Sequence, residues 1–252
     1  MMRANGVYVA PGWLPGGHAQ TIFPVFVRRP QVRYRRQRID TPDGDFIDFD
    51  WLATDRAESD APLVVLFHGL EGNSRSHYAL ALMAHLASLG WRGVVPHFRG
   101  CSGEVNRLPR AYHSGDYSEV GWMLHTLRKL SPRGPLFAVG VSLGGSALLN
   151  WLGREEHRAS DVVTAPLHGF SGTNDYWKRA SSKPWLRAVT VPTLVVNARN
   201  DPFIPASSLP TREETSAAIT LEQPRGGGHG GFPGRLAWLP LRMTAFFSSG
   251  PG

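Results

Sequence analysis

Short apolar runs alternate along this chain with segments of helical periodicity, and this order restricts the fold more than any other feature. Residues 62–69 (PLVVLFHG) form a continuous apolar run ending in glycine, which is typical of a buried central strand. A helical pattern follows at 75–89 and stops at Gly90, a residue common at helix C-termini. By the same criteria we predict strands at 91–100, 135–141, 160–166, 191–198 and 217–222, and helices at 115–130, 144–152 and 235–247.

The first part of the chain carries a different signal. Runs of strand character at 32–39 and 46–52 flank Thr41-Pro42-Asp43-Gly44, and Asp-Gly is a strong hairpin signal. A hairpin followed by repeated β-α units predicts an α/β fold of the α/β-hydrolase type. Its central sheet is mostly parallel, with an N-terminal antiparallel hairpin and helices on both faces. We expect residues 1–252 to form one domain, with an N-terminal arm at 1–31.

Composition excludes several classes of protein. Cys101 is the only cysteine, so no intramolecular disulfide can form. No apolar run approaches the ~18 residues that span a bilayer, and the first residues lack a signal-peptide pattern, so we expect a cytoplasmic protein. The net charge of +7 raises the question of nucleic acid. No nucleic-acid-binding motif accompanies the arginine-rich stretch 28–38, which we interpret as a solvated basic face on an edge strand.

The segment Gly140-Val141-Ser142-Leu143-Gly144 is the only G-x-S-x-G in the chain. It joins an expected strand to an expected helix, the context in which this motif presents a nucleophilic serine. A serine on such a turn is strained, and a Cβ at either flanking glycine would clash with neighbouring backbone. We therefore predict that Ser142 is a nucleophile, against the alternative of a turn without chemistry.

An attacking serine requires donors for the negative oxygen that develops on the substrate. The helix after the motif begins at Leu143 and points its free N–H groups towards that position. His68-Gly69-Leu70 follows the strand 62–67, where the second donor of this fold is expected. We predict an oxyanion hole formed by the N–H groups of Leu70 and Leu143, and a loop-bracing role for His68.

A base and an acid should follow the serine in the order acid, then base. His229 is the only histidine beyond His168, and its glycine-rich surroundings leave room for the ring to reach a serine. Asp201 lies just past the C-terminal end of the strand 191–198, where catalytic residues of parallel sheets gather. We predict His229 as the base and Asp201 as the acid that orients it. The competing acids are Asp161, Asp175 and Glu222.

Several longer segments together resemble the YheT-like family of α/β-hydrolases, a group regarded as esterases and lipases. The segments that carry the resemblance are 13–24 (WLPGGHAQTIFP), 68–78 (HGLEGNSRSHY), 97–115 (HFRGCSGEVNRLPRAYHSG), 140–153 (GVSLGGSALLNWLG) and 197–205 (NARNDPFIP). The resemblance implies the same Ser142, Asp201 and His229. It also implies that Arg99, His113 and Asp116 brace the loop that begins at residue 97.

The chain departs from this family in one respect. Family members carry a long, mainly helical lid between the strand after the motif helix and the segment that contains G-F…D-Y, whereas residues 164–167 pass here almost directly into 168–177. We therefore expect only a residual lid region at 166–180 and an open cleft. A lid excludes water and covers the acyl group, so its loss favours short-chain, soluble esters.

These observations predict a serine esterase that forms an acyl-enzyme with a small-molecule ester and needs no cofactor or metal. We expect no nucleic-acid partner and either a monomer or a homodimer. Three alternatives stay open: an acyltransferase, a lipase or phospholipase docked on an anionic membrane surface, which we do not favour, and an inactive binding module. Two interpretations remain for a set of aromatic residues: they form an apolar wall for the acyl group, or they pack in the core. These residues are Phe23, Tyr78, Phe170, Tyr176, Trp177, Phe203 and Phe232.

Overall fold

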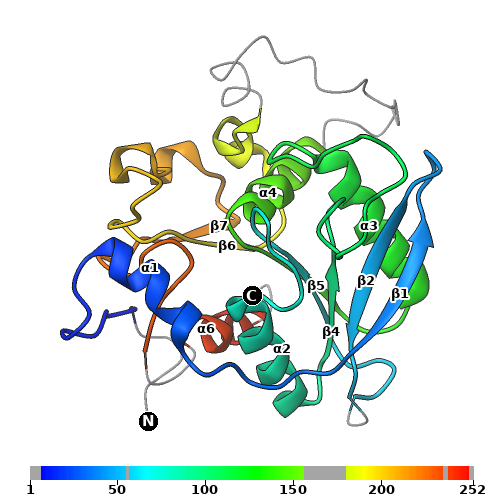
Figure 1. Cartoon of the computed structure of the whole chain (residues 1–252). Coiled ribbons are helices and arrows are strands. Elements are labelled where there is room, and N and C mark those ends of the chain that lie inside the picture. Colours follow the sequence, from blue (N-terminus) through cyan, green and yellow to red (C-terminus); the bar gives the residue numbers. More distant parts are fainter. Residues whose placement is uncertain (1–6, 55–56, 156–179, 235–237, 250–252) are drawn as a thin grey trace.

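A five-stranded mixed sheet with strand order β1-β2-β4-β3-β5 forms the centre of the protein (Figure 1). The structure is a computed structural model that describes residues 7–54, 57–155, 180–234 and 238–249. β1 pairs antiparallel with β2, and β2 with β4, whereas β3 is parallel to both β4 and β5. The strands are β1 (Tyr34–Asp40), β2 (Phe46–Leu52), β3 (Leu63–Phe67), β4 (Arg92–Pro96) and β5 (Leu136–Gly140). Two further strands, β6 (Thr193–Val196) and β7 (Ile219–Glu222), form a separate parallel pair.

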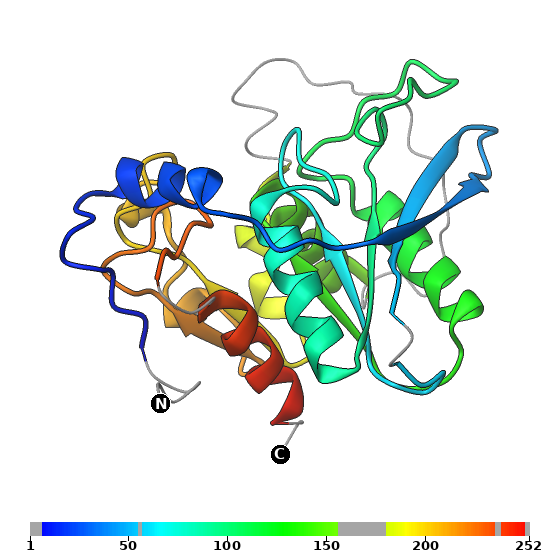
Figure 2. The ribbon, with the colours of Figure 1, turned by 60° about the horizontal axis from the view of Figure 1, so that its bottom comes forward.

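Helices cover both faces of the five-stranded sheet (Figure 2). One face packs against α2 (His77–Leu89) and α6 (Trp238–Ser248), and the other against α3 (Tyr117–Leu130) and α4 (Leu143–Glu155). The strand β3 is fully buried, and its side chains alternate between the two cores. This explains why its sequence is apolar throughout instead of alternating with polar residues.

The predicted α/β fold is confirmed, including the antiparallel hairpin and the parallel strands that follow it. Gly90 ends α2 in the left-handed conformation at φ 70°, and Gly44 takes φ 85° in the hairpin turn. The strand predicted at 160–166 and almost all of the residual lid region lie outside the described residues. Within the described part of the chain, no helix has the length and apolar character that crossing a bilayer requires.

The structure also contains a helix and three short 3₁₀ segments that the sequence pattern does not predict; the helix is α1 (Gly17–Phe26). Two glycines precede and begin α1, and Pro24 lies within it, so its sequence carries signals that normally argue against a helix. The 3₁₀ segments are Lys183–Ala188, Ala206–Ser208 and Arg212–Glu214.

The arginine-rich stretch corrects one prediction. β1 is an edge strand, as expected, but its basic face is not simply solvated. Arg36 forms a two-pronged ion pair with Asp50 at 2.7 and 2.9 Å, and Arg38 does the same with Asp48 at 2.8 Å. Both aspartate side chains are buried on β2, so these arginines supply charges that the fold requires.

Arg99 forms a second, deeper ion cluster. Its guanidinium is 3% exposed and contacts Asp43, Asp45 and Glu119 at 2.9, 2.8 and 2.6 Å. Burial opposes the ionisation of Asp45, but hydrogen bonds, led by that from Asn106, lower its pKa to about 2. The cluster joins the hairpin turn to α3, so the bracing role implied for Arg99 has a physical basis.

We predict that Arg99→Met lowers the free energy of unfolding by about 3–5 kcal/mol, because it leaves buried carboxylates without their partner. Urea denaturation followed by circular dichroism measures this. The control is Lys183→Met, which removes a partly exposed ion pair with Glu214 and should cost at most about 1 kcal/mol. Equal losses in the two variants would contradict the assigned importance of the cluster.

Candidate active site

Ser142 occupies the sharp turn between β5 and α4. Its φ is +53°, in the left-handed region that a non-glycine residue rarely adopts. A Cβ at Gly140 would lie 2.5 Å from the Gly145 Cα, and one at Gly144 would lie 2.4 Å from the Phe67 carbonyl oxygen. Both flanking glycines are therefore required by close backbone contacts, as the motif predicts.

The structure brings the three side chains that we predicted as nucleophile, base and acid into one hydrogen-bonded chain. His229 Nε2 lies 2.7 Å from Ser142 Oγ, and His229 Nδ1 lies 2.7 Å from Asp201 Oδ2. An ionised carboxylate can only accept a hydrogen bond, so Nδ1 carries the proton. Nε2 of the neutral ring then accepts from the Ser142 hydroxyl, which is the arrangement that a base needs.

Asp201 is held in place from its other oxygen. Its Oδ1 accepts hydrogen bonds from the N–H groups of Phe203 at 2.8 Å and Ile204 at 3.2 Å. The carboxylate side chain is only 8% exposed. Its two oxygens therefore serve different tasks, one fixing the loop after β6 and the other orienting the His229 ring.

The loop that carries His229 depends on glycine. Gly227, Gly228 and Gly230 have φ of 141°, 62° and 63°, which strongly disfavours other residues there. The His229 N–H donates to Thr21 Oγ1 at 2.9 Å. The ring lies edge-on to Phe203, with centroids 5.2 Å apart. The histidine is thus fixed at its backbone and at its ring.

Gln20 of α1 connects the loops of the acid and the base, and sequence reasoning missed it. Its side chain is buried, and its Oε1 accepts from the Gly227 N–H at 2.7 Å and from Asn200 Nδ2 at 2.9 Å. Asn200 Oδ1 in turn accepts from the Gly228 N–H at 3.0 Å. The polar pair Gln20-Thr21, followed directly by the apolar residues Ile22 and Phe23, is the sequence signal that could have indicated it.

The two residues predicted for the oxyanion hole lie beside the serine. Leu143 is the first residue of α4, and Leu70 follows Gly69, at which an added Cβ would lie 3.3 Å from the Ser142 Cβ. Among the described residues, neither the Leu70 nor the Leu143 N–H has a hydrogen-bond acceptor. Both donors are available to a ligand.

His68 braces this loop, as we predicted. The ring is fully buried, and burial lowers its pKa to about 4, so it is neutral at physiological pH. Nε2 accepts from the Phe98 N–H at 3.1 Å, and Nδ1 lies 2.8 Å from the Gly69 carbonyl oxygen. The ring therefore links the loop after β3 to the loop after β4. Among the described residues, it forms no hydrogen bond with Ser142.

The aromatic residues proposed for an acyl wall divide between two roles. Phe203 is 65% exposed and contacts the His229 ring, so it lies at the site. Phe232 is buried against Tyr8 and Trp238, which is core packing. Three of these residues lie outside the described residues: Phe170, Tyr176 and Trp177.

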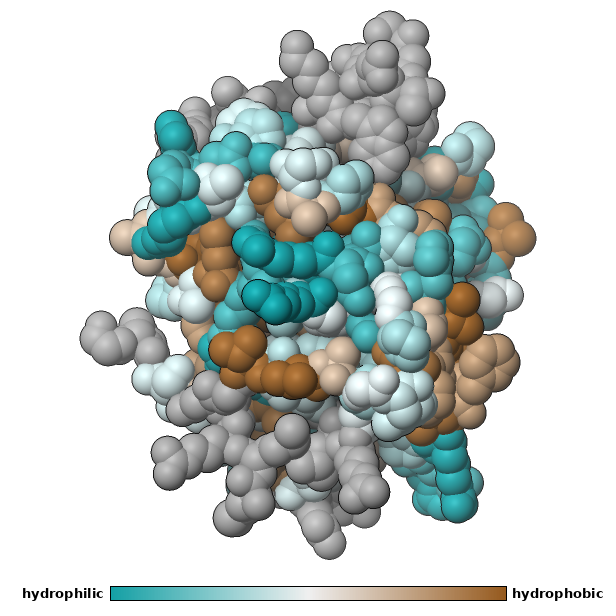
Figure 3. Space-filling view, turned by 90° about the vertical axis from the view of Figure 1, so that its left-hand side faces the viewer, coloured by the Kyte–Doolittle hydropathy of each residue, from teal (hydrophilic) through white to brown (hydrophobic). Residues whose placement is uncertain are grey.

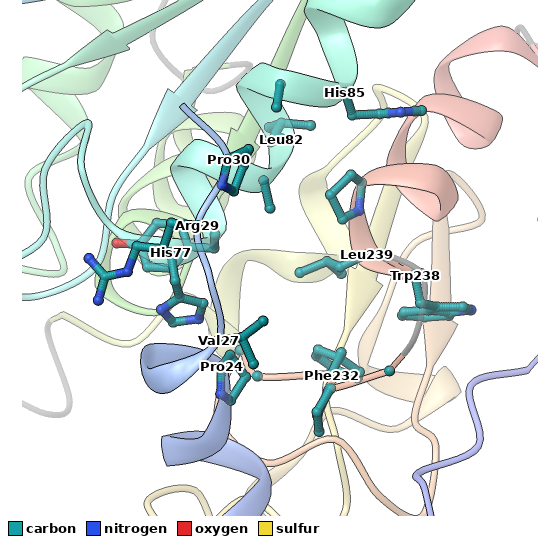
Figure 4. A pocket seen from close by; sticks show the side chains of 18 of the residues that line it. Pro24, Val27, Arg29, Pro30, His77, Leu82, His85, Phe232, Trp238 and Leu239 are labelled. Carbon is teal, nitrogen blue, oxygen red and sulfur yellow. The ribbon is translucent and has the colours of Figure 1, made fainter. Parts of the chain in front are cut away.

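A cavity of about 490 Å³ lies beside the site, between α2, α6, residues 23–30 and residues 230–234 (Figure 4). Val141 and Gly230 line it, each next in sequence to one of the predicted catalytic residues, but Ser142 and His229 do not. Its lining is mainly apolar and includes Leu82, Phe232, Trp238 and Leu239. Among the described residues, no cluster of three or more His, Cys, Asp or Glu side chains could hold a metal ion.

Comparisons with known proteins agree with this architecture. Residues 62–167 match the family model described as the alpha/beta hydrolase fold. YheT of Escherichia coli (strain K12), an esterase by name, is 31% identical over 307 aligned residues, covering 92% of this chain and 90% of that protein. Phospholipase ABHD3 of Homo sapiens is 27% identical, with 89% of this chain and 73% of that protein covered.

Among solved structures, Est1E from Butyrivibrio proteoclasticus with bound ferulic acid superposes with a TM-score of 0.64 at 15% identity. The superposition covers 85% of this chain and 100% of the Est1E chain, which supports the fold. The 307 positions aligned with YheT exceed the 252 residues of this chain, so YheT carries residues without a counterpart here.

We predict that Gln20→Leu slows the labelling of Ser142 by a fluorophosphonate probe about 10–100-fold, because small displacements of a base cost rates of this order. The leucine cannot accept from the Gly227 N–H or the Asn200 amide. Gln20→Glu keeps an acceptor oxygen and should lose less.

The matched control is Gln223→Leu, which removes the hydrogen bond from Gln223 to the Pro210 carbonyl. Both residues lie far from Gln20 in the sequence. It should label at the wild-type rate. A folded Gln20→Leu protein with an unchanged labelling rate would show that Gln20 does not position His229.

Proposed function

The chain belongs to the YheT-like family of α/β-hydrolases, and from this premise we propose that it is a serine carboxylic-ester hydrolase. One observation carries the proposal: the hydrogen-bonded chain from Ser142 through His229 to Asp201, built on a left-handed turn at the N-terminus of α4. The relatives named as esterase and phospholipase are consistent with ester cleavage.

The first half of the reaction forms an acyl-enzyme. His229 Nε2 removes the Ser142 proton while Oγ attacks the ester carbonyl carbon. The N–H groups of Leu70 and Leu143 donate to the carbonyl oxygen as it becomes negative, and the helix α4 adds its positive dipole end. The imidazolium, stabilised by Asp201, then gives its proton to the departing alcohol.

The second half releases the acid. His229 takes a proton from water, the water oxygen attacks the acyl carbon, and the Ser142 oxygen leaves with the proton returned by the imidazolium. The steps balance with ester and water as reactants and with acid and alcohol as products. No cofactor takes part in this proposal.

We propose short-chain, small-molecule esters as substrates. Ser142 is exposed, and the chain is shorter than its alignment with YheT, as expected if much of the lid is absent. An open site gives a long acyl chain little burial, so extra methylene groups should add little to transition-state binding.

We predict that Ser142→Ala reduces the hydrolysis of p-nitrophenyl acetate or butyrate by about 10⁴-fold or more, because the nucleophile is lost. Ser146→Ala is the matched control, since Ser146 lies one turn further along α4 and bonds the Ala180 carbonyl. Its activity should stay near that of the wild type. Equal rates for wild type and Ser142→Ala would overturn the proposed function.

We predict that activity on p-nitrophenyl esters is highest for acetate and butyrate and falls towards palmitate. Ala81→Trp, which fills part of the cavity, should leave the short-ester rates unchanged because the acyl group does not enter it. A maximum at long chains that Ala81→Trp removes would contradict the short-chain assignment and identify the cavity as the acyl pocket.

A further inference from the structure

The helix α1 has its polar face turned inwards and its apolar face turned outwards. Positions 17, 20, 21 and 24 recur at helical spacing on the inner side, where Gln20 and Thr21 bond the loop of His229. The outer side carries the exposed His18 and three apolar residues, Ile22, Val25 and Phe26, which are 51%, 44% and 80% exposed. This arrangement is the reverse of an ordinary surface helix, so the outer face requires an explanation.

Exposed apolar side chains also flank the helix in the sequence. Trp13 is 66% exposed before α1, and Val27 is 47% exposed after it. We call Trp13, Ile22, Val25, Phe26 and Val27 the outer face. Figure 3 views this side of the molecule, on which hydrophobic and hydrophilic side chains gather in separate patches.

Cationic side chains follow the outer face directly in the chain. Arg28, Arg29, Arg33 and Arg35 are exposed, and within the described ranges none of them pairs with a carboxylate. In the part of the chain that the structure describes, Arg29 donates to the backbone carbonyl oxygens of Val25 and Arg75. The stretch thus differs from Arg36 and Arg38, whose charges are used by buried aspartates.

We infer that the outer face docks on an anionic lipid surface. Exposed Trp and Phe side chains beside aliphatic residues insert at the boundary between headgroups and acyl chains, and adjacent arginines attract anionic headgroups. Net charge alone does not favour this partner, whereas the exposed apolar face beside arginines without carboxylate partners does. The inference does not depend on the proposed ester hydrolysis.

A second copy of the chain fits this face less well. A symmetric dimer through the outer face would gather the positive charges of Arg28 and Arg29 from both copies around one interface, which disfavours association. An anionic headgroup layer offers both the apolar depth and the opposite charge.

Docking in this way would place the site close to the lipid surface. The inner face of α1 contacts the His229 loop, and a helix with its side chains is about 10–12 Å across. Residues Phe23, Pro24 and Val27 of the same segment also line the cavity beside the site.

The test is co-sedimentation of the full chain with vesicles of phosphatidylcholine alone and of phosphatidylcholine mixed with phosphatidylglycerol, at low and high salt. We expect binding only to the anionic vesicles, weakened by salt. Ile22→Ser/Phe26→Ser and Arg28→Glu/Arg29→Glu should each lower the partition coefficient at least tenfold. Their turnover of soluble p-nitrophenyl butyrate, measured in parallel, reports whether the site remains intact.

Matched controls are Val105→Ser, a 93% exposed apolar residue elsewhere, and Lys129→Glu/Arg133→Glu, which makes the same charge change at the end of α3. Both should bind like the wild type. Absence of binding by the wild type, an equal loss in the controls, or light scattering that shows a dimer broken by Ile22→Ser/Phe26→Ser would overturn the inference.

Discussion

The buried amide of Gln20 is the interaction on which the geometry of the site depends. The proposed acid and base lie on two loops that have little regular structure of their own, one after β6 and one after β7. Gln20 accepts from Gly227 and from Asn200, so one side chain fixes the distance between these loops. A hydrogen bond left unmade in a buried position is costly, which makes this junction specific as well as stabilising. The short hydrogen bonds of His229 to Ser142 and Asp201 therefore depend on α1, a helix near the beginning of the chain.

Ser142 is positioned in a different way, by close backbone packing that leaves no room for other conformations of the turn. Backbone atoms stand where a Cβ at Gly140 or Gly144 would lie, so the strand and the helix approach each other closely at the turn. This packing holds Ser142 at a positive φ that its side chain would otherwise avoid. The neighbouring sheet is rigid because β3 is buried on both faces and pairs with β4 and β5. The packing of a large part of the core thus maintains the strained backbone conformation of Ser142.

The parts of the structure that were predictable from sequence are those whose signals are local. The apolar run 62–69 matches a strand that is buried on both faces, and the helical spacing before Gly90 matches a helix that ends at a glycine. The serine motif likewise lies between a strand and a helix. The helix α1 was missed because Pro24 and two glycines obscure it, and because its polar face is inside. The partners of Arg99 were also hidden, since pairing between residues 43, 45, 99 and 119 depends on how the hairpin, loop and α3 meet. Long-range polar contacts leave no periodic trace in a sequence.

If the outer face docks as proposed, the two faces of α1 would link a lipid surface to the candidate active site. A helix of ten residues with an internal proline has little stability of its own, and its apolar side finds no core to enter. The hydrogen bonds that Gln20 and Thr21 accept from the loop of His229 help to hold the helix in place. Burial of Phe26 and its neighbours in a headgroup layer would stabilise the same helix. A loop conformation that favours an ordered α1 would be stabilised by the same free energy. Because such coupling is reciprocal, docking as proposed and the alignment of His229 would strengthen each other.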